Sequence, residues 1–465
     1  MPFGHYHMLC TSVRNRSGDV TAEQCLDELR DPRCYPHAPS AVKIIQTHLS
    51  VVCLAGEVVY KLKKAVTLPF VDFSSLDARR ETCRAEVRLN RRLCPDMYLG
   101  TAALRREGDH LTFAAIGDDD SDEDLDVAVV MRCLPADRML DELLRRGKAT
   151  PAHMRQLAEL IAKFHRNAVR DEATRRHGNP ENLRQFALAN FDELREVEAH
   201  GLSLDLLDSL ARSTRSNFES IAEELHERAA SSFLVDGHGD LHTRNVCMTE
   251  PPTVYDCIEF EPAFRCGDVA TEIAFLSMDL RYRGAPSLAD TFVAAYVTAT
   301  GDFRLPALLP TLSSYRAMVR AKVAALTSIE PEQSDEDRAA AGKSARHHLL
   351  LAAAYAIETR GPWWLLICGP PASGKSRLAN LLADTVQWPH LATDAIRKQL
   401  AGVAPTEPAR PEHYSAEFSE QTYTALLAAA GKGTASGQCC VMLDGNFATS
   451  ERRAAAAQAA RAAGA

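Results

Sequence analysis

The stretch His238–Asn245, which reads HGDLHTRN, decides how most of this chain folds. It places Asp240 and Asn245 five residues apart, with a histidine two positions before the aspartate. That is the spacing of phosphoryl-transfer loops, in which the aspartate orients the attacking hydroxyl, the asparagine binds magnesium and the histidine braces the loop. We therefore predict a catalytic site built on Asp240, His238 and Asn245.

The strand after this loop is expected to supply a further ligand for the metal ion. Phosphoryl transfer needs a carboxylate there, because magnesium bridges the nucleotide phosphates. Glu259 lies at that place, within Ile258-Glu259-Phe260, and Asp256 lies three residues earlier. The sequence ranks Glu259 first and leaves Asp256 as the competing candidate.

A sheet and a helix are predicted near the beginning of the chain. Residues 42–64 alternate apolar and polar side chains around Ala55-Gly56-Glu57, which predicts two strands joined by a tight turn. Apolar side chains at helical spacing then predict an amphipathic helix over 76–93.

The second of these strands carries the cation that should hold the nucleotide phosphates. Val58-Val59-Tyr60-Lys61 is similar to the V-A-I-K strand, whose lysine pairs with a helix carboxylate. Glu86 in the predicted helix is the expected partner. Lys63 points to the same face as Lys61, because strand side chains repeat every two residues. The spacing from the turn favours Lys61 and leaves Lys63 open.

A second phosphate motif, GPPASGKS at Gly369–Ser376, fits the pattern G-x-x-x-x-G-K-[ST]. An apolar run precedes it and a helical pattern follows it, which is the strand and helix context that this motif requires. Backbone N–H groups around Gly369 and Gly374 are expected to cradle phosphates. Lys375 would reach the β and γ oxygens, and Ser376 would bind magnesium. The chain is thus predicted to hold nucleotide at two separate sites.

Composition limits the class and location of the protein. The chain has 465 residues, which suits two or three domains. Its net charge is −9 and it has no clear basic stripe, which disfavours nucleic acid as a partner. No apolar run is long enough to span a bilayer, no secretory segment is apparent, and the 13 cysteines lack metal-site spacing. We expect a cytoplasmic protein with reduced thiols and no membrane partner, of undetermined oligomeric state.

Residues from about Tyr35 to Leu326 resemble the aminoglycoside phosphotransferase family, a branch of the protein-kinase-like fold. The loop of that family, H-G-D-[LI]-H-x-x-N, is matched by HGDLHTRN. The resemblance implies ATP as phosphate donor, Mg²⁺ as cofactor, a small-molecule acceptor, and an adenine-binding hinge with Met131 as a contact. Two departures stand out. Glu272 replaces an aspartate that is usual in the family, and residues 47–50 lack a glycine-rich cover.

The region after the second phosphate motif resembles small-molecule P-loop kinases and zeta-toxin-like proteins. In such proteins a D-x-x-R pair lies beside the acceptor substrate, and Asp394 and Arg397 match it. A helix cap with a surface arginine is the alternative. Asp444 ends an apolar strand and is a predicted magnesium ligand. An arginine-bearing lid is not found before Ala465, so we expect either a domain that binds nucleotide better than it turns it over or a shortened C-terminus.

The predicted fold class is α/β. An α+β, protein-kinase-like two-lobe domain is expected over 1–355, with an N-lobe at about 35–132 and a helical C-lobe at about 133–345. A P-loop NTPase domain with a three-layer α/β fold is expected over 361–465.

The predicted function is ATP-dependent transfer of the γ-phosphate to a small-molecule hydroxyl at the first site, with a second nucleotide-binding domain. The alternative is a nucleotide-binding regulatory or toxin–antitoxin-like protein with little transfer activity. Glu259, Glu272 and the absent lid favour that alternative. The identity of the acceptor, antibiotics included, does not follow from the resemblance.

Overall fold

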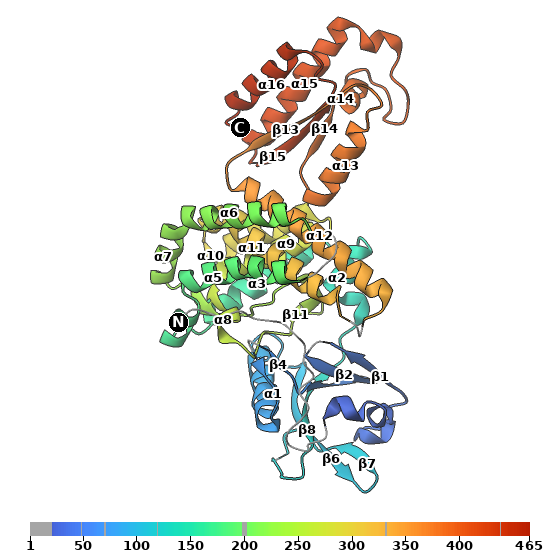
Figure 1. Ribbon diagram of the computed structural model, residues 1–465, viewed down its shortest axis with the longest axis vertical. Helices are drawn as coiled ribbons and strands as arrows, with labels where there is room; N and C mark the ends of the chain where they lie inside the picture. Colours follow the sequence, from blue (N-terminus) through green and yellow to red (C-terminus); the bar gives the residue numbers. More distant parts are fainter. Residues whose placement is uncertain are drawn as a thin grey trace. The chain divides into compact units, whose positions relative to one another are not determined.

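The computed structural model describes residues 21–47, 49–68, 71–118, 120–197, 202–330, 333–437 and 439–465. The chain divides into two compact units, and Figure 1 traces it from blue to red. The first unit comprises Met1–Phe186, Ala222–Asp279 and Ser287–Pro306, and the second comprises Ala187–Ile221, Leu280–Pro286 and Ala307–Ala465. In the described ranges, no helix is long and apolar enough to cross a membrane and every cysteine is a free thiol.

An antiparallel six-stranded sheet in the order β1-β2-β3-β8-β6-β7 forms one part of the first unit (Figure 1). Its strands are β1 (Val42–Gln46), β2 (Ser50–Ala55), β3 (Val58–Lys63), β6 (Tyr98–Glu107), β7 (His110–Phe113) and β8 (Asp126–Arg132). The predicted turn joins β2 to β3, with Gly56 at a φ of +67°. The predicted first strand was wrong in one respect, because it is divided in two. Thr47 N–H donates to Ser50 O at 2.9 Å and reverses the chain between β1 and β2. Of the residues 47–50, His48 lies outside the described ranges.

Helix α1 (Leu76–Asn90) lies between β3 and β6 in the chain, where the sequence predicts a helix over 76–93. Ser75 caps it, since its hydroxyl accepts a hydrogen bond from the Ala78 N–H at 3.2 Å. Cys83 and Val87 belong to a buried cluster that also contains residues of β3 and β8. Glu86 lies on the same buried face of the helix because it is three residues from Cys83. The packing of α1 therefore carries a carboxylate to the sheet.

Short strands complete the first unit, and the helices between residues 140 and 358 are divided between the two units, with α6 and α12 wholly in the second. The short strands are β4 (Thr67–Leu68), β5 (Val71–Asp72), β9 (Leu234–Asp236), β10 (Val246–Cys247), β11 (Thr253–Val254) and β12 (Cys266–Asp268). The helices are α2 (Leu140–Arg145), α3 (Pro151–Asn167), α4 (Glu172–His177), α5 (Pro180–Glu196), α6 (Leu204–Ser220), α7 (Ala222–Ala230), α8 (Pro262–Arg265), α9 (Val269–Tyr282), α10 (Pro286–Thr300), α11 (Leu305–Thr327) and α12 (Asp335–Glu358).

The second unit contains a three-stranded parallel sheet in the order β13-β15-β14. Its strands are β13 (Trp363–Cys368), β14 (His390–Ala392) and β15 (Cys440–Gly445), and its helices are α13 (Lys375–Val386), α14 (Thr393–Leu400), α15 (Ala416–Ala435) and α16 (Ser450–Ala462). Alternate residues of β15 are buried on opposite faces. Met442 packs with Ala379 of α13, whereas Leu443 packs with Leu426 of α15 and Ala456 of α16. A parallel sheet covered by helices on both faces is a three-layer α/β arrangement.

Candidate active site

The HGDLHTRN loop brings Asp240 and Asn245 into contact. The Asn245 side-chain amide donates to Asp240 Oδ2 and to Asp240 O, each at 3.0 Å. His242 Nε2 lies 3.3 Å from Asp240 Oδ2. Gly239 adopts a φ of +83°, and a Cβ there would lie 2.8 Å from the Phe264 carbonyl oxygen, so only glycine fits this turn. The loop thus holds a carboxylate and an amide side by side, as the spacing predicts.

Helix α9 supports this loop with carboxylates that accept hydrogen bonds from the loop backbone. Glu272 Oε1 accepts the backbone N–H groups of both His238 and Gly239, the latter at 2.6 Å. Its other oxygen, Oε2, lies 2.8 Å from Nε2 of the buried His165. Asp279, two turns further along α9, accepts the Thr243 N–H at 2.9 Å. The glutamate that departs from the family pattern therefore acts as an acceptor for the loop backbone.

His238 is fully buried and holds the loop to the strand that follows. Its Nε2 lies 3.0 Å from the Tyr255 carbonyl oxygen. Burial lowers the pKa of His238 below its ordinary value, so the ring is neutral near pH 7. A neutral imidazole can donate one hydrogen bond to that carbonyl and needs no counter-ion. His238 therefore joins the loop to the segment that contains Tyr255.

Lys61 on β3 is joined to two carboxylates. Its Nζ lies 2.9 Å from Glu86 Oε1 on α1 and 2.7 Å from Asp256 Oδ1. Burial by itself lowers the pKa of Lys61, but Asp256 and Glu86 raise it well above its ordinary value. For Glu86 the directions are reversed: burial by itself raises the pKa, but Lys61 and Lys63 lower it to about 2. Lys61 and Glu86 are therefore both charged at neutral pH.

Lys63 contacts Glu86 as well, so the structure brings both candidate lysines to one carboxylate. Lys63 Nζ lies 2.5 Å from Glu86 Oε2 and also donates to Glu259 Oε1. The two lysines differ in exposure: the side chain of Lys61 is 16% exposed and that of Lys63 is 2% exposed. Asp256 is 43% exposed and Glu259 is 6% exposed. Only the Lys61–Asp256 pair is open to solvent.

Backbone hydrogen bonds fix the Asp256 segment to the loop. Tyr255 N–H donates to Asn245 O at 3.0 Å, and Ile258 N–H donates to His238 O at 3.1 Å. Asp256 itself adopts a φ of +62°, in the left-handed region that aspartate tolerates better than most residues. The loop and the Lys61 cluster therefore form one continuous site within the first unit.

The oxygen donors of this site have the chemistry that Mg²⁺ prefers, because carboxylates and amide oxygens are hard ligands. Asp256 is partly exposed, and Asn245 uses its amide nitrogen on Asp240, which leaves its amide oxygen for a metal ion. Among the described residues no three His, Cys, Asp or Glu side chains form a ready metal cluster. Phosphate and water oxygens would complete the coordination, as is usual for Mg²⁺.

Met131, the predicted hinge contact, lies at the end of β8. It is 6% exposed and packs in the cluster that contains Val59 and Tyr98. One residue beyond the strand, the Cys133 N–H donates to the Glu57 carbonyl oxygen at 2.8 Å. The Met131 side chain is thus part of the buried cluster shared by the sheet and α1.

The shape of the P-loop in the second unit comes from the backbone conformation at its glycines. Gly374 adopts a φ of +87° at the start of α13, and a Cβ on Gly369 would lie 2.8 Å from Ser373 Oγ. Lys375 Nζ donates to the loop's own Pro370 carbonyl oxygen at 3.3 Å, and Ser376 is exposed. Strands β13 and β15 pair so that Asp444 stands opposite Ile367, close in register to the loop.

Asp444 on β15 and His390 on β14 lie close together in the parallel sheet. Asp444 is 2% exposed, and its Oδ2 lies 3.5 Å from His390 Nε2. Its Oδ1 has no hydrogen-bond partner within the part of the chain that the structure describes. A buried carboxylate oxygen without a partner is costly and fits a cation that binds with nucleotide.

Asp394 and Arg397 lie one turn apart on α14, and each contacts a different neighbour. Asp394 is exposed and pairs with Lys398 at 3.0 Å. Arg397 is buried, donates to the His413 carbonyl oxygen at 2.7 Å and lies over the Tyr414 ring at 4.7 Å. Each side chain therefore has a local partner.

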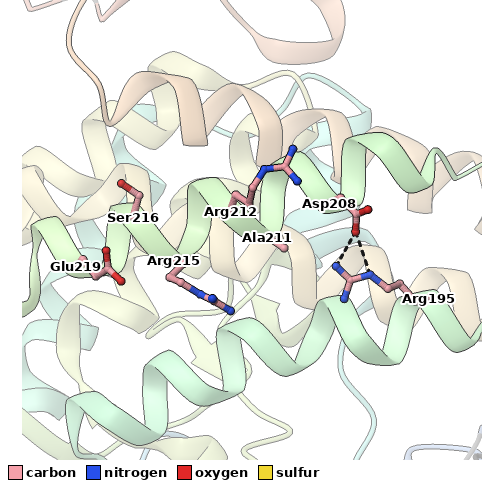
Figure 2. Close-up of a pocket in the computed structure, with 7 residues that line it drawn as sticks. All are labelled: Arg195, Asp208, Ala211, Arg212, Arg215, Ser216 and Glu219. Carbon is pink, nitrogen blue, oxygen red and sulfur yellow. Dashed lines mark hydrogen bonds and ion pairs between the residues drawn. The ribbon is translucent and has the colours of Figure 1, made fainter.

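A groove of about 320 Å³ lies between α5 and α6 in the second unit (Figure 2). Arg195 from α5 pairs with Asp208 from α6 at 2.8 Å, and Arg212 and Arg215 project from α6. Its surface is formed by exposed side chains, and it contains none of the predicted site residues.

Comparison with known proteins agrees with this geometry. The model of the phosphotransferase enzyme family matches residues 75–308, and that of an AAA domain matches residues 365–465. The chain belongs to the phosphotransferase enzyme family. Membership makes it a phosphotransferase with a hydroxyl acceptor. The predicted fold, kinase-like and followed by a P-loop domain, is confirmed.

Relatives and solved structures extend the comparison. Uncharacterised proteins of Mycobacterium tuberculosis and Mycobacterium bovis are each 31% identical to this phosphotransferase over 421 residues, covering 89% of this chain and 80% of the relative. A choline/ethanolamine kinase family protein from Mesorhizobium loti is 14% identical, with a TM-score of 0.43 over 78% of this chain and 99% of that one. An ethanolamine kinase of Plasmodium vivax is 13% identical, with a TM-score of 0.39 over 66% and 81%. The substrates in those names belong to those proteins.

Three contributors to the site were missed from the sequence. They are His165 and Asp279, which support the loop, and Asn90, whose Oδ1 accepts the Cys257 N–H at 2.9 Å. Each is a polar residue that is buried on a helix. A polar residue on the apolar face of a predicted helix is the signal that could have indicated His165.

Proposed function

We propose that the first unit transfers the γ-phosphate of ATP to a hydroxyl group of a small molecule. Asp240 would orient the hydroxyl and accept its proton as the phosphoryl group moves. Lys61, held by Glu86, would contact the nucleotide phosphates from β3. The observation that carries this proposal is the continuity of the site, since Tyr255 and Ile258 tie the Asp256 segment to the Asp240 loop.

Magnesium would be held by Asn245 and Asp256 in this proposal. The ion would supply positive charge that neutralises the phosphate oxygens during transfer. Asp256 is the more suitable carboxylate because its side chain is 43% exposed, whereas that of Glu259 is 6% exposed. Met131 would lie behind the adenine as part of the hinge.

We further propose that residues 361–465 form a second nucleotide-binding domain and that 1–355 form the transferase domain. Gly369 and Gly374 shape the loop that would cradle phosphates, and Lys375 is free to turn from its own loop carbonyl to a phosphate. Ser376 and Asp444 would face the metal ion there.

A regulatory role remains the second candidate for this P-loop domain. Arg397 is committed to the His413 carbonyl and to the Tyr414 ring, and Asp394 to Lys398. A domain that binds ATP without efficient transfer, as in a regulatory or toxin–antitoxin-like protein, would have this arrangement.

The proposal is tested by incubating the full chain with ATP, Mg²⁺ and a panel of small hydroxyl compounds, and by detecting phosphorylated products by mass. We expect at least one compound to gain a phosphoryl group and an equal amount of ADP to form. ADP formation that is independent of every hydroxyl compound, with no phosphorylated product, would favour the regulatory candidate.

A further inference from the structure

Two lysines share one carboxylate in this site, although their surroundings differ. Lys61 and Lys63 each donate to a separate oxygen of Glu86. Lys61 also reaches Asp256, which is open to solvent, and Lys63 also reaches Glu259, which is sealed from it. Beside Lys63 lies the buried ring of Phe73, 5.9 Å from Nζ. The second ion pair is therefore inaccessible to a hydrated ion or a phosphate.

Consecutive residues of the segment that bears Asp256 are each fastened to a different element. Cys257 N–H donates to Asn90 Oδ1 on α1, and Ile258 N–H donates to His238 O in the loop. Glu259 follows and accepts from Lys63 on β3. The segment is thus tied to the helix, the catalytic loop and the sheet in turn. The Glu259–Lys63 contact joins the segment to β3 beside the Asp256–Lys61 contact, and it is made by side chains alone.

Counting the formal charges of the cluster distinguishes Asp256 from Glu259 as candidate metal ligands. The ammonium groups of Lys61 and Lys63 are matched by the carboxylates of Glu86 and Glu259. Asp256 is then the surplus negative charge of the five groups. A buried charge is stable only when it is paired, so removing Glu259 leaves Lys63 under-compensated. A cation at Asp256, in contrast, would complete the balance.

We propose that Lys63 and Glu259 are a positioning pair, which fixes the Asp256 segment against β3 and α1, and that Glu259 is not a metal ligand. The inference rests on the proposed function of this site, because it assigns Asp256 to the metal. Mg²⁺ keeps several water ligands in protein sites and so needs an open approach. Asp256 offers one and Glu259 does not. The pair also holds Glu86 between two ammonium groups, so α1 is kept in place before nucleotide arrives.

The test uses the full chain carrying Lys375→Ala, so that nucleotide binding at the P-loop is weakened and binding at the first site can be followed. In this background we compare Glu259→Gln, Asp256→Asn, Lys63→Met and the double variant Lys63→Met/Glu259→Met. Lys64→Met is the matched control, because Lys64 is the next residue on the chain and its Nζ lies 3.7 Å from Glu23, outside the cluster. Calorimetry gives the dissociation constant of the ATP analogue AMP-PNP with Mg²⁺ and with EDTA.

A positioning pair predicts that Glu259→Gln and Lys63→Met weaken AMP-PNP binding about 10- to 100-fold, the usual cost of losing a residue that supports a metal site. The ratio of the affinities with and without Mg²⁺ should stay within about threefold of the parent value, whereas Asp256→Asn should bring it near one. The double variant should recover at least about tenfold over the single variants, because an apolar pair can replace a buried ion pair. Lys64→Met should bind like the parent.

Other outcomes are equally decisive. If Glu259→Gln abolishes the Mg²⁺ dependence as Asp256→Asn does, Glu259 is a metal ligand and the inference fails. A double variant no better than Lys63→Met also overturns it. If single variants fail to fold, a folded double variant supports the pair and an unfolded one contradicts it. Failure of the proposed function looks different, since the parent itself would then show no Mg²⁺-dependent AMP-PNP binding.

Discussion

The two phosphate sites of this chain are organised in opposite ways. In the first unit, Lys61, Lys63, Glu86 and Glu259 are mostly buried and are already paired with one another. In the P-loop, Lys375 bonds only weakly to the Pro370 carbonyl at 3.3 Å, and Asp444 Oδ1 has no partner in the described part of the chain. The first site is preorganised by side-chain charge, whereas the second is shaped by its backbone.

This difference indicates how each site should respond to substitution. Side chains that are paired and buried contribute to folding and to chemistry together, so changing them affects both. A loop whose shape comes from glycine and from a helix N-terminus keeps its fold when one side chain is removed. The predictions below test this contrast, beginning with the largest expected effect.

Lys61→Met is expected to lower the rate of phosphorylated product formation by roughly 10²- to 10³-fold, because a positioned cation stabilises charge on the transferring group. Lys64→Met is the control and should leave the rate unchanged. Initial rates with a responsive hydroxyl compound measure the effect. Should Lys61→Met retain the parent rate, the contrast between the two sites would lose its basis.

Glu272→Gln is expected to destabilise the first unit by roughly 3 kcal/mol, since it replaces a buried carboxylate that contacts His165 and accepts two backbone N–H groups of the loop. Chemical denaturation measures the change. Arg304→Ala removes an exposed ion pair to Glu227 and is the control, with an expected midpoint near that of the parent. Equal midpoints for all three proteins would show that α9 does not brace the loop.

The contacts of Glu272 also predict that the stability of the fold decreases in acid. Burial by itself raises the pKa of Glu272, but His165 and the Gly239 N–H lower it to about 2, from an ordinary value of 4.5. A carboxyl group whose pKa is lower in the folded state stabilises the fold above its unfolded pKa. That contribution is lost as the pH falls from about 4.5 to about 2. Denaturation of Glu272→Gln should therefore show a shallower pH dependence in this range than the parent.

Lys375→Ala is expected to weaken nucleotide binding at the P-loop by about tenfold or more, because it removes the charge directed at the β and γ oxygens. The thermal midpoint should remain that of the parent, since Lys375 contacts only its own loop. Calorimetry and thermal unfolding give the two quantities. A large loss of stability would mean that this site is preorganised by side chains after all.

Asp444→Asn is expected to have a small effect on folding, opposite in sign to that of Glu272→Gln. Removing a buried charge that lacks a full complement of partners should stabilise the second unit by about 1 kcal/mol. Mg²⁺-dependent nucleotide binding at the P-loop should weaken at the same time. Destabilisation by this variant would show that the carboxylate is already satisfied without nucleotide.

Much of the architecture could be predicted from local sequence patterns. The strand pair around Gly56, helix α1 and the P-loop follow from alternation, helical spacing and glycine, which act over a few residues. Local spacing also placed Glu86 on a face that reaches Lys61, and the structure brings them together. The extra turn between β1 and β2 was missed because it depends on hydrogen bonds between Thr47 and Ser50, which the alternation of apolar and polar residues does not reveal.

Long-range pairing could not be predicted in the same way. Lys63 and Glu259 are 196 residues apart, and strand periodicity states only that Lys63 shares a face with Lys61. The burial of Glu259 and the exposure of Asp256 depend on how β3, α1 and the HGDLHTRN loop pack around them. For the same reason the sequence could not show that Arg397 is turned towards the His413 carbonyl.

The account's central claim is that phosphoryl transfer takes place at the Asp240 loop and not at the P-loop. The most direct test compares the rate of phosphorylated product formation in the parent, Asp240→Asn and Lys375→Ala, at saturating ATP and Mg²⁺. The account predicts a loss of about 10²- to 10⁴-fold for Asp240→Asn, the usual contribution of a positioned general base, with product formation retained in Lys375→Ala. Retained transfer in Asp240→Asn together with its loss in Lys375→Ala would contradict the account and place the chemistry in the second unit.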